Sequence, residues 1–278
     1  MRLKMKSYEN LVETDIQEFE ETLANANSEW NGIFQEAVNS EITFINEGAD
    51  YLNEGIASKF MNSIKKFFVN IAGWIKKRYT DLKNFTNKTL TKMKAVFGLI
   101  EKFATENEDR IINGAKTGEV TVTIRDWHPQ LLNIAEIERV LATLNYSSDE
   151  FDSIMKETQE FVDSYFKSDK LVEVKVTQQM AKTAISNAKN SVNIDKVIKK
   201  YVDEAEKALK KTEDASKEGA RNTKDEQAVI ENKDKVEEGK RDILKSSKKA
   251  SILINLVNRA VVDSHKINVA CASMYTGE

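Results

Sequence analysis

Residues 56–104 read IASKFMNSIKKFFVNIAGWIKKRYTDLKNFTNKTLTKMKAVFGLIEKFA and carry the strongest periodic pattern in the chain. Apolar side chains recur there at steps of three and four residues, or at sums of such steps, which is the spacing of one helix face. They are Phe60, Ile64, Phe67, Ile71, Trp74, Leu82, Phe85, Met93, Phe97 and Ile100. Lysine and arginine fill many positions between them. The segment therefore predicts one long cationic amphipathic helix, or two such helices broken near residues 84–87.

The composition extends this expectation to the rest of the chain. Among 278 residues there is one proline, whereas about one residue in twenty is proline in ordinary proteins. Sheet-rich folds need many turns, and turns recruit proline and glycine. We therefore expect a mainly α fold of elongated helical hairpins or a bundle. One cysteine and two histidines exclude the usual zinc and disulfide sites.

Two short segments break the helical pattern. Residues 119–125 (EVTVTIR) and 171–176 (LVEVKV) alternate polar and β-branched residues, as strands do. Between them, Pro129 fits the first turn of one helix, and Ser147 with Glu150 has capping-box spacing for the next. The sequence thus predicts a small inserted strand–helix–helix–strand element, whose two-stranded sheet needs those helices for support.

The remaining segments complete four expected divisions: an acidic helical part at 1–55, cationic helices at 56–117, the α+β part at 118–177 and a C-terminal helical hairpin at 178–278. Within the last, residues 195–249 carry 16 basic and 14 acidic side chains and few large apolar ones. That composition favours exposed helix or a partly disordered connection, especially at 212–226. An apolar face returns after residue 243, and we expect it to pack against the helix near 179–210.

Charge is segregated along the first hundred residues. Residues 7–58 hold 12 acidic side chains and no basic one, whereas residues 59–102 hold 11 basic side chains against Asp81 and Glu101. The simpler interpretation is that the acidic segment folds back on the basic one. The alternative is that the basic segment faces an external polyanion, DNA or anionic lipid, and that the acidic segment restrains it.

The candidate contact residues lie in the most basic part of that helix: Lys65, Lys66, Lys76, Lys77 and Arg78. Lysines beside Phe67, Phe68 and Trp74 are typical of a helix lying on an anionic bilayer. The same lysines suit duplex phosphates, which would give a steep salt dependence. The simplest explanation is that the apolar residues face a helix bundle and the lysines face water.

No catalytic or cofactor-binding pattern is found. His128 follows Asp126 at a strand end without a nearby nucleophile, which favours a turn role. His265, among Asp263, Ser264 and Lys266, is expected at the surface, and Cys271 is expected to be a small buried residue. Phosphate-loop, dinucleotide and H-E-x-x-H motifs are absent. We therefore expect no enzyme activity and no cofactor.

Two features together resemble virion structural or internal head proteins of large tailed bacteriophages. One is the acidic lead containing Phe34-Gln35-Glu36-Ala37-Val38 and the tetrads Ile45-Asn46-Glu47-Gly48 and Leu52-Asn53-Glu54-Gly55. The other is the cationic, Phe-rich helix that follows. In such phages the prohead protease cuts after a glutamate two residues beyond an aliphatic residue. The resemblance implies processing after Glu47 and Glu54, which would remove the acidic block.

The resemblance further implies a non-enzymatic role in the virion, with host cytoplasm as the location during assembly. The expected partners are other virion proteins or further copies of the chain, with DNA next and a membrane ranked behind it. An alternative is a membrane-active protein similar to α-helical pore-forming toxins, binding anionic lipid through residues 59–79. A host-interaction effector is a third hypothesis. No leader or membrane-spanning stretch is evident, so we expect a soluble protein of a reducing compartment.

Overall fold

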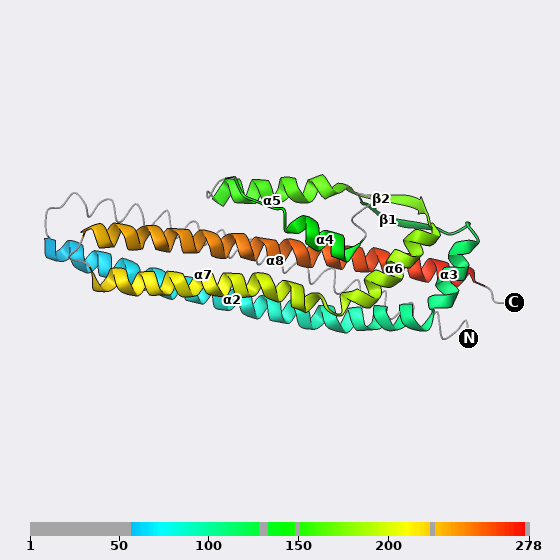
Figure 1. Cartoon of the computed structure of the whole chain (residues 1–278), viewed down its shortest axis with the longest axis horizontal. Helices are drawn as coiled ribbons and strands as arrows, with labels where there is room; N and C mark the ends of the chain where they lie inside the picture. Colours follow the sequence, from blue (N-terminus) through cyan, green and yellow to red (C-terminus); the bar gives the residue numbers. More distant parts are fainter. Residues whose placement is uncertain (1–56, 128–132, 148–150, 223–225, 276–278) are drawn as a thin grey trace. The chain divides into compact units, whose positions relative to one another are not determined.

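The fold is taken from a computed structural model of the chain, which describes residues 57–127, 133–147, 151–222 and 226–275. Within these residues it contains seven α-helices, α2 to α8, and one two-stranded antiparallel sheet (Figure 1). The predicted mainly α fold with a small β insertion is confirmed. The predicted acidic segment 1–55, with Glu47 and Glu54, lies outside the described residues.

Helix α2 is a single helix, Ala57–Glu106, so the expected alternative of a break near residues 84–87 is wrong. Asn84 and Asn87 are exposed within it, where polar side chains meet water. The helix contains no proline, and its glycines, Gly73 and Gly98, cost helix stability without ending the helix. Its last part is anchored in a core through Met93, Phe97 and Ile100, each fully buried.

The described chain divides into two compact units. Unit 1 contains the described residues of Lys88–Lys199 and those from Lys249 onward; unit 2 contains residues 57–87 and the described residues of Lys200–Lys248. Helices α2, α7 (Ile194–Arg221) and α8 (Glu226–Met274) contribute residues to both.

Unit 1 is organised around the second part of α8. Every residue from Ile252 to His265 is buried or half-buried, including polar residues such as Asn258 and Asp263. Helices α3 (Glu108–Lys116) and α6 (Gln178–Ser191) pack beside it. Asn268 of α8 donates to the Ala184 carbonyl of α6 at 3.4 Å. Four residues earlier, Ser264 meets Asn187, so α6 and α8 run antiparallel, as the apolar seams predicted.

The inserted element of unit 1 has the predicted order. Strand β1 (Thr121–Trp127) and strand β2 (Phe166–Lys175) pair antiparallel, with helices α4 (Ile134–Leu141) and α5 (Phe151–Tyr165) between them along the chain. Val122 lies opposite Val174 and Ile124 opposite Val172. The predicted capping partner Glu150 and the predicted first-turn residue Pro129 lie outside the described residues. Ser147 instead donates its backbone N–H to Glu157 at 2.8 Å.

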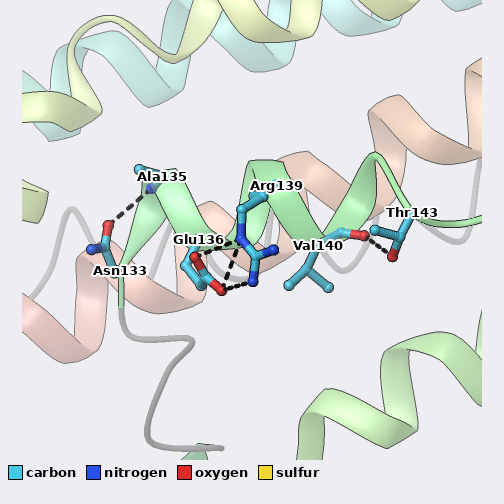
Figure 2. Close-up of polar contacts among 6 residues, drawn as sticks. All are labelled: Asn133, Ala135, Glu136, Arg139, Val140 and Thr143. Atoms are coloured by element: carbon cyan, nitrogen blue, oxygen red, sulfur yellow. Dashed lines mark hydrogen bonds and ion pairs between the residues drawn. The ribbon is translucent and has the colours of Figure 1, made fainter.

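Helix α4 is short, and polar side chains form hydrogen bonds at both of its ends. Asn133 at its start accepts the Ala135 N–H at 3.0 Å, and Thr143 donates to the Val140 carbonyl after its end (Figure 2). An exposed pair between Glu136 and Arg139 lies along its side (Figure 2). The hydrogen bond from Arg139 lowers the pKa of Glu136. These contacts satisfy backbone groups that a helix leaves open at its ends.

Unit 2 contains a close pairing of α7 with the first part of α8. Most of the residues that α7 buries in this unit are small: Ala205, Ala208, Thr212, Ala215 and Ser216, beside the larger Tyr201 and Leu209. They allow the two backbones to approach, and Gly239 of α8 lies directly against Thr212. Of the two expected alternatives for 212–226, exposed helix or a partly disordered connection, residues 212–221 are helix, with a buried face that was not expected. Few large apolar residues are needed when small ones bring helices together.

Among the described residues, none of the helices is long and apolar enough to span a membrane.

Candidate polyanion-binding face and a buried polar cluster

The candidate cationic residues lie on α2, in unit 2. Lys76 and Lys77 are exposed, whereas Lys65, Lys66 and Arg78 are placed only as helix positions because their side chains lie outside the described part. Thr80, one turn after Lys76, is also exposed, and its hydroxyl donates back to the Lys76 carbonyl at 2.8 Å. This part of α2 therefore presents a polar, basic surface, as the sequence predicted.

Among the described residues, acidic side chains form ion pairs with only some of the basic side chains on this surface. Lys83 of α2 lies 3.8 Å from Glu206 of α7, and both side chains are about half exposed. Lys76 and Lys77 have no ion-pair partner within the described residues. Among the described residues, the acid that pairs with this part of α2 comes from α7. The 12 acidic residues of segment 7–58 lie outside the described range.

A similar pairing occurs in unit 1, where Lys94 of α2 donates to Asp195 of α7 at 2.8 Å. That hydrogen bond lowers the pKa of Asp195, which keeps the carboxylate charged. Both pairs are solvent-exposed, so each contributes little to folding stability. Their consequence is electrostatic, because they neutralise two α2 lysines, whereas no acid within the described ranges neutralises Lys76 and Lys77, named here the 76/77 lysine pair.

A buried ion pair in unit 1 joins β1 to α8. Asp263 is fully buried, and its two carboxylate oxygens accept from the Arg125 backbone N–H at 3.3 Å and from the Arg125 guanidinium at 3.4 Å. Lys266 lies 3.7 Å away on the same helix. A buried carboxylate is costly unless it is paired and hydrogen-bonded. Arg125 therefore fixes where β1 meets α8.

A buried amide beside it joins three helices. Asn187 of α6 accepts the first N–H of α4, from Ile134, at 3.2 Å and donates to the Ser264 hydroxyl of α8 at 3.0 Å. Both side chains of this bridge are buried. Because both ends of the amide are satisfied, the contact sets the relative register of α4, α6 and α8 within the unit.

His265 is not at the surface, so the sequence expectation was wrong. Only 6% of it is exposed, and its ring meets the Phe103 ring edge-on at 5.3 Å between centroids. Burial lowers the pKa of His265 to about 4, so the ring is neutral at neutral pH. The polar neighbours Asp263 and Ser264 suggested a solvent-exposed position, but both are buried and form hydrogen bonds with Arg125 and Asn187 inside the protein.

The other candidate chemistry gives no catalytic site in the described part of the chain. Asp263 contacts Arg125 rather than a histidine, and Cys271 is buried as predicted, with its thiol pKa raised to about 11 by that burial. Within the described ranges, no three His, Cys, Asp or Glu side chains cluster as a metal site would require. His128 lies outside these ranges.

Sequence reasoning missed the Asp263–Arg125 and Asn187–Ser264 contacts. One signal was available on α8, where Leu253, Val257 and Val261 are followed at the same helical spacing by Ser264 and Asn268. Polar residues that continue an apolar stripe are candidates for buried hydrogen bonding. Their partners lie 77 and 84 residues away in the chain, so the pattern alone does not identify them.

In comparisons with known proteins, no family model, no curated protein and no solved structure matches this chain.

Proposed function

We propose that this chain is a non-enzymatic structural or internal protein of a tailed-phage virion, which packs through its helices and contacts DNA through the 76/77 lysine pair. The observation that carries the DNA contact is that Lys76 and Lys77 are exposed without an acidic partner in the part of the chain that the structure describes, while Lys83 on the same helix is paired with Glu206. The virion assignment rests on the resemblance of the first hundred residues to such proteins. Assembly would place the chain first in the host cytoplasm and then in the particle.

The processing pattern gives this proposal an electrostatic rationale. Cutting after Glu47 and Glu54 would remove most of a segment with 12 acidic and no basic side chains. The basic helix after it would then keep its charge in the presence of packaged DNA. Each lysine that neutralises a phosphate releases counterions, which makes binding tighter at low salt and steeply salt-dependent.

The local sequence favours α2 over the other exposed lysine pair of unit 2. Lys210 and Lys211 of α7 are also adjacent and exposed, but acidic Glu206, Glu213 and Asp214 lie within one or two turns of them. Around Lys76 and Lys77 the nearest charged positions are Arg78, Asp81 and Lys83. A phosphate chain therefore meets net positive charge on α2 and a near-neutral surface on α7.

This difference supplies a matched test. The variant Lys76→Gln/Lys77→Gln is compared with Lys210→Gln/Lys211→Gln, which has the same net charge, in duplex binding across a salt series. We expect the α2 variant to lower the slope of log affinity against log salt by about 2, and the α7 variant to leave it close to that of the unchanged protein. Equal slopes in the two variants would show that the binding follows overall charge and would exclude the 76/77 lysine pair as the contact.

One observation favours the membrane-active alternative. Val69 is 58% exposed on α2, two helical turns before Lys76 and on the same side of the helix. An exposed apolar residue beside lysines suits the surface of an anionic bilayer. Co-sedimentation with phosphatidylserine vesicles that persists in high salt, and is lost in Val69→Asn, would favour this function over DNA contact.

A further inference from the structure

The outer edge of β2 is a surface that the proposed function does not use. In the described sheet, β2 pairs with β1 only, and the order is β1–β2. The other edge of β1 is occupied, because the Arg125 N–H is bonded to the carboxylate of Asp263 on α8. In Figure 1, β1 lies between β2 and α8.

The register determines which backbone groups of β2 point outward. Val176 donates its N–H to the Val120 carbonyl at 2.9 Å, which makes their pairing one of the hydrogen-bonded kind. Such pairs alternate with non-hydrogen-bonded ones along an antiparallel ladder. Val174 and Val172 therefore bond to β1, and the N–H and C=O groups of Leu171, Glu173 and Lys175 point away from it.

The side chains along this edge alternate in exposure and in charge. Leu171, Glu173 and Lys175 are exposed on one face of the sheet, with Leu171 at 55%. Val172 and Val174 are half-buried on the other face. Within the described ranges no other strand pairs with the outward-pointing backbone groups of this edge, and such an edge is a template for another strand.

We propose that β2 pairs antiparallel with β2 of a second copy of this chain, about a two-fold axis at Val174. In this register Glu173 lies opposite Lys175 of the second copy, and Lys175 lies opposite Glu173 of the second copy. The two chains then share one sheet in the order β1–β2–β2–β1. The self-complementary charge pattern is what identifies the occupant as a second copy.

The other registers are disfavoured by backbone direction and by charge. An axis between two residues would set outward-pointing groups against inward-pointing ones, so no ladder could form. An axis at Glu173 would oppose two glutamates, and an axis at Lys175 would oppose two lysines; like charges directly opposite are destabilising. Of the axes at Glu173, Val174 and Lys175, only the one at Val174 gives two opposite-charge pairs. An axis at Val172 would rely on residues before Leu171, where the pairing with β1 is irregular. This interface does not depend on DNA binding or on a virion location.

Cysteine cross-linking of the full-length protein tests the register directly. At the axis, Val174 of each copy forms a non-hydrogen-bonded pair with a Cα separation of about 4.5 Å, within the range that a disulfide spans. Val172 of the two copies would be offset by four residues, about 13 Å along the strands. Val172→Cys is thus a matched control on the same face, and the native Cys271 is buried in both variants.

We expect mild oxidation of Val174→Cys to give a disulfide-linked dimer on non-reducing gels and Val172→Cys to remain monomeric. Adding Lys175→Glu should lower the cross-linked yield of Val174→Cys several-fold, because it places glutamate opposite glutamate. Adding Glu173→Lys as well should restore the yield, since the charges are then exchanged but still complementary. Circular dichroism checks that each variant is folded.

A second arm covers the case in which one charge variant folds poorly. Val174→Cys chains carrying Glu173→Lys are mixed with Val174→Cys chains carrying Lys175→Glu, one of them bearing a mass tag. Mixed dimers should exceed both self-dimers. The proposal is overturned if Val174→Cys stays monomeric, if Val172→Cys cross-links as well as Val174→Cys, or if like charges leave the yield unchanged.

Discussion

Gly114 of α3 lies directly against the carbonyl oxygen of Cys271 in α8. A Cβ built on Gly114 would overlap that oxygen and would lie 2.7 Å from the carbonyl carbon. Since the obstacle is backbone within a helix, it cannot rotate away as a side chain could. The contact is reinforced nearby, where the Arg110 guanidinium donates to the Ala272 carbonyl at 3.4 Å. The crossing of α3 and α8 therefore requires glycine at position 114.

We expect Gly114→Ala to lower the free energy of unfolding by about 2 kcal/mol or more, because α3 must move away from a packed core. Gly98→Ala is the matched control, since a Cβ at Gly98 meets nothing within 4 Å. The control should raise stability by up to about 1 kcal/mol through helix propensity. Urea denaturation measures both. Equal effects of the two substitutions would show that the Gly114 contact is not rigid.

The elements of the fold were predictable where one local pattern dominates. The apolar spacing of 56–104 predicted α2, and the alternation at 119–125 and 171–176 predicted the two strands within a few residues of their bounds. The choice between one and two helices near Asn84 and Asn87 was not predictable, because asparagine is tolerated on an exposed helix face. The buried face of 212–221 was missed because small residues carry little hydrophobic signal.

Of the candidate site, the sequence predicted which residues are exposed but not which residues pair with one another. Lysine side chains on a helix are usually exposed to solvent, and Lys76 and Lys77 are exposed as expected. Which lysines are neutralised depends on acids far away in the sequence, such as Glu206 for Lys83. The same holds for Asp263, whose partner Arg125 is 138 residues distant. A single sequence does not identify such partners, since many arginines and aspartates could pair.

The approach of α7 and α8 in unit 2 gives a second prediction. A Cβ on Gly239 would overlap the Thr212 hydroxyl and would lie 3.0 Å from the Thr212 Cβ. We expect Gly239→Ala to cost about 1–3 kcal/mol of unfolding free energy. In a Thr212→Ala background the same substitution should cost clearly less, because the hydroxyl is gone. A thermal or urea double-mutant cycle measures this coupling. Additive effects would mean that the two helices move apart freely.

A buried and an exposed ion pair of unit 1 together test whether burial or distance determines the contribution of an ion pair to stability. Asp263 is fully buried and Arg125 mostly so, although their oxygen and nitrogen are 3.4 Å apart. Lys189 and Glu108 are closer, at 2.6 Å, but both are more than a third exposed. We expect Arg125→Leu to cost about 3 kcal/mol, because it removes the main partner of a buried carboxylate. Lys189→Ala should cost under about 1 kcal/mol.

Both variants are measured by urea denaturation at neutral pH. Asp263→Asn serves as a second probe of the buried pair, since it keeps the shape and removes the charge. We expect it to cost less than Arg125→Leu, because the charge left without its partner is then the partly exposed Arg125 guanidinium rather than the fully buried Asp263 carboxylate. A larger loss from Lys189→Ala than from Arg125→Leu would contradict the argument that burial decides.

The buried ring of His265 makes stability fall in mild acid. Its folded pKa of about 4 lies below the usual 6.5, so the unfolded chain binds a proton that the folded chain resists. The stabilising effect of the neutral ring is complete above pH 6.5 and is lost as the pH falls toward 4. The loss attributable to this group amounts to about 3 kcal/mol. Among the described residues, the buried ring nitrogen Nδ1 has no hydrogen-bond partner that would stabilise the charged ring.

Urea denaturation at intervals between pH 7.5 and 4.5 measures this dependence, with His265→Leu as the comparison. The variant keeps an apolar side chain against Phe103 and has no proton to gain. We expect the two proteins to differ by a nearly constant amount above pH 6.5, with the unsubstituted protein losing stability faster below it. Carboxylates titrate in both proteins and cancel in the difference. If the difference stays constant down to pH 4.5, His265 accepts its proton without unfolding, and the ring is more accessible to water than its burial implies.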